Sequence, residues 1–268
     1  MNGQDQAQRP GATRYVPARR EVLAAMATMG AALALPGAFR ATSAHATIAP
    51  VSAPALSPKA CRESVGDLLN TTLTAERLTL TCYYTALVTP VLLKQIAGSP
   101  AGPSGMAGNV ACLQAALHQE QNHAMILELL GARSPYRTFY LPAMALATLG
   151  YTSQAGTFLW MLDHLETACI AAYMQRIERY MTLQHPDLAW LAARILGVEA
   201  EHRALYRVIA QDYPANNVTL EVAQFTCASD IQRVLDPYLT GKRLPGRAHR
   251  VVALPTQAQI ERVLAKMM

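Results

Sequence analysis

The sequence predicts an all-α protein, built as an antiparallel four-helix bundle with one long crossover and a C-terminal extension. Four long segments between residues 60 and 215 repeat apolar residues at helical spacing. Clusters of glycine, proline and serine separate these segments. Alternating patterns typical of β-strands are scarce, and Val251-Val252 is the only indication of one. Together these observations favour helices that pack on one another.

The four helices are expected near residues 62–95, 108–131, 153–184 and 187–212. Gly98-Ser99-Pro100 ends the first helix, Gly131 ends the second, and His185-Pro186 separates the third from the fourth. The connection over residues 132–152 is longer than the other two, so we expect two helical hairpins joined by a crossover.

The first 46 residues are typical of an export signal. Arg19-Arg20 precedes an apolar run from Val22 to Leu35, and Ala44-His45-Ala46 offers a cleavage site after Ala46. The run is about 14 residues long, whereas a bilayer span needs about 20, so an uncleaved anchor is the less favoured alternative. The arginine pair resembles a twin-arginine signal. We therefore expect a periplasmic or secreted protein, with a linker over 47–59 and no membrane span in the mature chain.

Five cysteines remain after this cleavage: Cys61, Cys82, Cys112, Cys169 and Cys227. None has C-x-x-C spacing, which argues against a thiolate zinc site or a thioredoxin-type motif. An odd number leaves at least one free thiol in an oxidising compartment. Cys61 and Cys227 flank the helical region and are candidates for a disulfide bond.

Each expected helix places one glutamate on the face that should be apolar, because residues three, four or seven apart share a helix face. The polar residues on these faces are Glu76 and Tyr83, Glu120 and His123, Glu166 and Tyr173, and Glu199 and His202. Four carboxylates in one core would repel each other, and each would cost several kcal/mol to bury unpaired. A pair of metal ions supplies the opposite charge, and carboxylates with imidazoles suit iron or manganese.

The spacing of these residues is specific. About 0.3 Glu-x-x-His pairs are expected by chance from the composition, and two occur, at Glu120/His123 and Glu199/His202. Residues three apart on a helix can bind the same ion. Glu76 and Glu166 each precede a tyrosine by seven residues, which gives the chain a twofold internal repeat. Tyr83 and Tyr173 are candidate catalytic residues, as hydrogen-bond or one-electron donors, and the alternative is that they are plain core aromatics.

This ordered set of residues resembles the ferritin-like di-iron carboxylate superfamily. The two Glu-x-x-His motifs are similar to those of bacterioferritin and rubrerythrin. The signal, the segment Phe139-Tyr140-Leu141-Pro142 and the stretch LDHLETACIAAY resemble the exported group that includes desiccation-related proteins. The resemblance covers about residues 60–215 and implies a ferritin-like bundle. It also implies six metal ligands, with Glu120 and Glu199 bridging or chelating, and Glu76 and Glu166 terminal or bridging, alongside His123 and His202.

The resemblance implies two iron ions as cofactors, or manganese, with O₂ or peroxide as the small-molecule substrate. The expected activity is then that of a ferroxidase or peroxide scavenger in protection from oxidative stress. A non-catalytic metal-binding or desiccation-protective protein is the alternative. A third possibility is an oxygenase that acts on an organic substrate. The sequence gives no evidence for or against a pocket for such a substrate.

Residues 216–268 are expected to form the C-terminal extension. The basic residues of its last part either contact an anionic partner or are simply solvated. The stretch QAQIERVLAKMM has the pattern of a short amphipathic helix, which docks on the bundle or on a second subunit to make a homodimer. The formal charge of +5 is too small for the basic footprint of a nucleic-acid-binding protein.

Overall fold

The computed structural model describes residues 61–99, 106–212, 214–216, 220–246 and 248–265. The expected signal peptide and linker, residues 1–46 and 47–59, lie outside this part of the chain. The elements are α2 (Val65–Val88), α3 (Pro90–Gly98), α4 (Met106–Leu129), β1 (Thr138–Pro142), α5 (Phe158–Thr182), α6 (Pro186–Ile209), α7 (Ala228–Thr240), β2 (His249–Ala253) and α8 (Gln257–Leu264). The predicted all-α class is confirmed.

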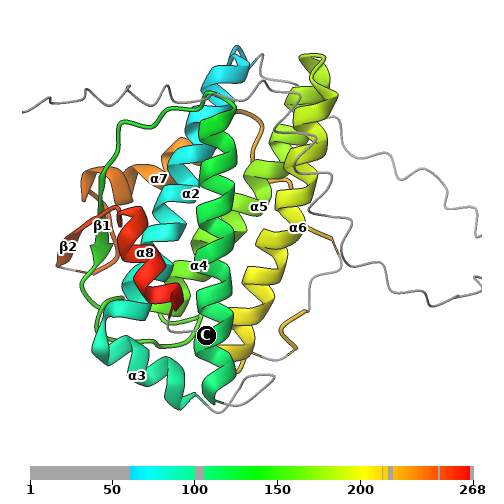
Figure 1. Cartoon of the computed structure of the whole chain (residues 1–268). Coiled ribbons are helices and arrows are strands. Elements are labelled where there is room, and N and C mark those ends of the chain that lie inside the picture. Colours follow the sequence, from blue (N-terminus) through cyan, green and yellow to red (C-terminus); the bar gives the residue numbers. More distant parts are fainter. Residues whose placement is uncertain (1–60, 100–105, 213, 217–219, 247, 266–268) are drawn as a thin grey trace, which may run out of the picture. The chain divides into compact units, whose positions relative to one another are not determined.

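Four long helices, α2, α4, α5 and α6, form the bundle (Figure 1). The closest helix packing is within two hairpins, α2 with α4 and α5 with α6. Hydrogen bonds between α2 and α4 join residues in reverse order along the chain, Arg77 to Glu128 and Thr79 to Glu120, so the two helices are antiparallel. This agrees with the hairpins expected from the connection lengths.

The ends of these helices follow from local sequence. Ser64 caps α2 and accepts a hydrogen bond from the Asp67 N–H, while Asp67 accepts one from the Ser64 N–H. The expected first helix over 62–95 is wrong as one continuous element. It breaks at Thr89, whose backbone is extended, and α3 starts at Pro90. The ring of a proline disfavours helical geometry in the residue before it, which explains the break.

The crossover contains a strand that the sequence pattern did not indicate. Its β1 pairs antiparallel with β2, placing Phe139 opposite Val252. The strand indicated by Val251-Val252 therefore forms, but its partner lies more than 100 residues away and carries no alternating pattern. The pairing ties the C-terminal extension to the crossover. Helix α7, which the sequence reading did not predict, packs on α2, α5 and β1.

The amphipathic helix expected near the C-terminus is α8, and it docks on the bundle. It packs on α2 and α4 (Figure 1) and buries Ile260 and Val263. The side-chain amide of Gln114 on α4 donates a hydrogen bond of 3.1 Å to the Val263 carbonyl. This helix therefore covers one side of the first hairpin.

A disulfide bond joins Cys61 to Cys227, the pair that the sequence analysis named as candidates. Their Cα atoms are 5.6 Å apart, and the bond links the chain just before α2 to the start of α7. Of the three free cysteines in the described residues, Cys82 and Cys169 are buried and Cys112 is partly buried. Among the helices described, none is long and apolar enough to cross a bilayer.

Candidate metal centre

The six residues expected to bind metal come together in the centre of the bundle. They are Glu76 on α2, Glu120 and His123 on α4, Glu166 on α5, and Glu199 and His202 on α6. All six are buried, with at most 7% of the residue surface exposed. The four long helices each contribute at least one of them, as the helical spacing predicted.

The ligand atoms form two overlapping groups. The first group takes Glu76, Glu120, His123 and Glu199, and the second takes Glu120, Glu166, Glu199 and His202. Within each group the ligand atoms all lie within 4.8 Å of one another. Two glutamates, Glu120 and Glu199, belong to both groups, and each group adds one glutamate and one histidine of its own. The arrangement matches two adjacent cation positions with two shared carboxylates.

Both imidazoles turn Nδ1 toward the carboxylates. His123 Nδ1 lies 3.2 Å from Glu76 Oε2 and 3.1 Å from Glu199 Oε1. His202 Nδ1 lies 3.6 Å from Glu199 Oε2, and its Nε2 is 2.8 Å from the side-chain oxygen of Gln119. A hydrogen bond from Nε2–H to Gln119 leaves the Nδ1 lone pair directed at the carboxylates, which is the tautomer a metal ligand requires.

Apart from the close contacts between imidazole nitrogens and carboxylate oxygens, several polar atoms of this cluster make no hydrogen bond within the described part of the chain. They are both carboxylate oxygens of Glu199, Oε1 of Glu120, Oε2 of Glu166 and Nδ1 of His202. Buried polar atoms are normally hydrogen-bonded, and leaving a charged one unsatisfied is costly. These atoms converge on one another, and all of them are N or O donors suited to a hard or borderline cation. The residues present therefore fit bound metal.

The two tyrosines of the internal repeat hydrogen-bond across the bundle. Tyr83 on α2 donates to Glu166 Oε1 on α5 at 2.5 Å, and Tyr173 on α5 donates to Glu76 Oε1 on α2. Each phenol therefore positions the glutamate of the opposite hairpin. The ring of Tyr83 also packs edge-on against His202, with centroids 5.6 Å apart.

Two further contacts were missed in the sequence. Thr79 donates a hydrogen bond of 2.5 Å to Glu120 Oε2, and Gln119 orients His202. Thr79 lies three residues after Glu76 on the same helix face, so a search for polar residues on that face would have found it. Gln119 precedes Glu120 directly, and its position on α4 carries no comparable pattern.

The close packing of charged groups in this cluster shifts their pKa values. Burial and the nearby Glu120 and Glu199 raise the pKa of Glu76 to about 8, and burial also raises the pKa of Glu166. Burial alone would lower the pKa of His123, but Glu199 and Glu76 raise it to about 10. The pKa of His202 is raised in the same way. For Glu199, the two imidazoles outweigh burial and lower the pKa. At neutral pH Glu76 and His123 therefore carry protons when no cation is bound.

A small cavity adjoins this cluster. Its volume is about 10 Å³, and its walls include Tyr83, Cys112 and His202. A cavity of this size has room for about one water molecule. The space beside His202 is therefore large enough for one very small molecule.

Comparison with known families decides the relationship. A family profile described as a ferritin-like domain matches residues 64–212, which is more than half of the chain. The chain belongs to this ferritin-like family. The matched range contains all six clustered glutamates and histidines, and the ferritin-like domain ends before α7. No individual curated protein and no solved structure matches the chain.

Proposed function

We propose that this ferritin-like protein holds a dinuclear iron or manganese centre that reacts with O₂ or peroxide. The observation that carries the proposal is the pair of overlapping ligand groups, which share Glu120 and Glu199. One carboxylate pair common to two positions is what two adjacent cations need to offset their mutual repulsion. Such chemistry would protect the cell from oxidants.

The clustered residues would have different roles in the centre. Glu76 and His123 would hold one ion and Glu166 and His202 the other, with the shared glutamates between them. When bound, the two metal ions would supply the electrons that reduce the oxidant. Tyr83 and Tyr173 fix the carboxylates that belong to single positions. The cavity at His202 has room for one molecule about the size of O₂ or peroxide.

Export is part of the proposal. The basic pair and apolar run within residues 1–46 are typical of a signal peptide, and the twin-arginine type suits a protein that folds before transport. The Cys61–Cys227 disulfide supports an oxidising compartment, since such bonds are rare in the cytosol. Sequencing the N-terminus of the exported protein tests this, because cleavage after Ala46 gives a chain that starts at Thr47.

The direct test of the activity is an oxidant-consumption experiment. The protein is loaded anaerobically with Fe²⁺ and mixed with O₂ or peroxide. An electrode measures the loss of oxidant, and the absorbance of Fe³⁺ measures the oxidation of iron. Faster oxidant loss than with free Fe²⁺ supports the proposal. A loaded protein that consumes no oxidant would instead be the non-catalytic metal-binding alternative. A wild-type protein purified without metal from iron- and manganese-replete cells would overturn the metal centre itself.

Replacing a positioning tyrosine should separate metal binding from turnover. In Tyr173→Phe, Glu76 loses its hydrogen bond, and we expect the oxidation rate to fall about tenfold, as for other groups that orient metal ligands. Metal content should stay near the wild-type value. Tyr84→Phe, on the same helix as Tyr83 but with its side chain outside the cluster, is the matched control. Equal rates for Tyr173→Phe and the control would show that the phenol does not act on the centre.

Metal binding should release protons and strengthen as the pH rises. At pH 7 the raised pKa values keep His123 and Glu76 protonated in the metal-free protein, and bound cations require both deprotonated. We expect Mn²⁺ affinity to increase at least about tenfold per pH unit between pH 6 and 8. Calorimetry in buffers of different ionisation enthalpy counts the released protons. A binding enthalpy independent of the buffer would contradict this expectation.

A further inference from the structure

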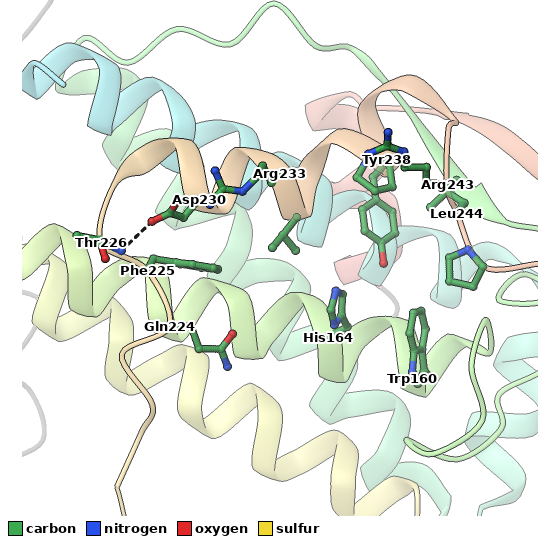
Figure 2. A pocket seen from close by; sticks show the side chains of 13 residues that line it. Trp160, His164, Gln224, Phe225, Thr226, Asp230, Arg233, Tyr238, Arg243 and Leu244 are labelled. Atoms are coloured by element: carbon green, nitrogen blue, oxygen red, sulfur yellow. Dashed lines mark hydrogen bonds and ion pairs between the residues drawn. The ribbon is translucent and has the colours of Figure 1, made fainter. Parts of the chain in front are cut away.

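A second candidate binding site lies on the other side of α5, outside the metal cluster. It is a pocket of about 780 Å³ between α5, α7, the segment 224–226 and the turn 243–245 (Figure 2). This volume is in the range of small-molecule sites. None of the six clustered glutamates and histidines lines it, so its occupancy is a separate question from metal binding.

One wall of the pocket is aromatic. Trp160 and His164 project from α5, with their rings stacked at 5° and centroids 5.4 Å apart. Partial burial lowers the pKa of His164, so its ring is neutral at pH 7. Phe225 adds a third ring from the segment before α7. Flat aromatic surfaces of this kind bind planar aromatic groups by offset stacking.

A tyrosine lines the pocket from the opposite side. Tyr238 on α7 is only 2% exposed, and Figure 2 shows its phenol directed from α7 toward α5. Its side chain lines the pocket, so its hydroxyl can donate a hydrogen bond to a bound ligand. Burial raises the pKa of Tyr238, so the hydroxyl keeps its proton and is a donor. A ligand oxygen in the pocket would accept this hydrogen bond.

The charge of the pocket is positive. Asp230 is the only acid in its lining, and it already accepts hydrogen bonds from the backbone N–H groups of Thr226 and Cys227 and pairs with Arg233. Arg243 lines the opposite end, and no carboxylate pairs with it within the described part of the chain. The arginine therefore remains available to bind an anion.

We propose that this pocket binds a small aromatic carboxylate. Its ring would stack on Trp160 and its carboxylate would pair with Arg243, while an oxygen substituent would accept the hydrogen bond from Tyr238. The arginine, the phenol and the aromatic wall lie at separate positions in the pocket. A ligand that contacts all three needs a carboxylate, an oxygen acceptor and an aromatic ring. Aliphatic acids lack the stacking surface, and uncharged aromatics leave the arginine without a partner.

The sequence makes a direct fluorescence test practical, because Trp160 and Trp190 are the only two tryptophans. In a Trp190→Phe background, 4-hydroxybenzoate should quench Trp160 with a saturable curve and a Kd below about 1 mM. We expect 4-hydroxybenzamide and cyclohexanecarboxylate to bind at least about tenfold more weakly. Calorimetry on the unaltered full chain measures the same affinity without any substitution.

Variants then assign the contacts. Arg243→Gln should weaken 4-hydroxybenzoate about tenfold and Tyr238→Phe about threefold. Lys242→Gln is the matched control, because it removes a neighbouring positive charge that does not line the pocket. The proposal fails if the wild-type chain shows no saturable binding, if the uncharged amide binds equally well, or if Lys242→Gln is as damaging as Arg243→Gln.

A carboxylate could also bind at the metal centre, and one further variant excludes this. Glu120→Ala with Glu199→Ala removes both shared metal ligands but no pocket residue, so its affinity for 4-hydroxybenzoate should equal that of the wild type. Loss of binding in this variant would place the ligand at the centre and overturn the pocket. Conversely, the pocket proposal survives a failure of the metal proposal.

Discussion

Replacing Glu120 and Glu199 together with alanine is expected to reduce the metal content from about two ions per chain to none. Both glutamates belong to both ligand groups, so their loss leaves each ion position with one carboxylate and one imidazole. The measurement is elemental analysis of protein purified from iron- and manganese-replete cells. Helical circular dichroism should persist, because the apolar core that packs the helices together does not include these two side chains.

A graded series makes this expectation sharper. Glu76 belongs to the first group only, so Glu76→Ala should retain about one ion per chain. Glu201→Ala is the matched control, because Glu201 is exposed on the same helix as Glu199 and lies outside both groups. Full metal content in the double variant, or equal loss in the control, would contradict two positions with shared carboxylates.

Removing the disulfide with Cys61→Ser and Cys227→Ser should lower the free energy of unfolding by about 3–5 kcal/mol. The bond closes a long loop, since its cysteines are 166 residues apart, and it restricts the unfolded chain accordingly. It also holds the start of α7 beside α2, where the Ala228 N–H donates a hydrogen bond of 2.9 Å to Glu63. Urea unfolding followed by circular dichroism gives the difference.

The control for this substitution is Cys112→Ser. Cys112 is a free, partly buried thiol on α4, so replacing it should change the free energy of unfolding by less than about 1 kcal/mol. If the disulfide variant is as stable as this control, the bond does not constrain the chain. Reduction of the wild type with dithiothreitol should reproduce the effect of the double substitution.

The helices of the bundle were predictable because their positions along the chain follow from the local periodicity of apolar residues. The last three long helices lie close to their expected ranges, and the error in the first arises at Thr89-Pro90, where one proline changes the backbone. The pairing of β1 with β2 was not predictable, because strands more than 100 residues apart share no local pattern. Helix α7 has a similar origin, since its apolar face is stabilised by contacts with α2, α5 and β1.

The cluster was predictable at the level of residue identity. Glu-x-x-His spacing and a glutamate on each core face fix the helix positions, and helix packing then brings the six side chains together. Helical spacing alone does not give the division into two groups, because this depends on side-chain rotamers across four helices; it was the family resemblance that implied Glu120 and Glu199 as bridging or chelating ligands. The hydrogen bond from Gln119 to His202 was hidden for the same reason.

The sharing of glutamates between the two groups has a mechanical consequence. Each ligand group takes atoms from both hairpins. Helix α6 therefore cannot separate from α4 without disrupting both ligand groups at once. Ions held there would bind the folded chain and not the opened one, which adds their binding free energy to the cost of local opening. Amide hydrogen exchange along these two helices would slow together, and the two hairpins would open as a single cooperative unit.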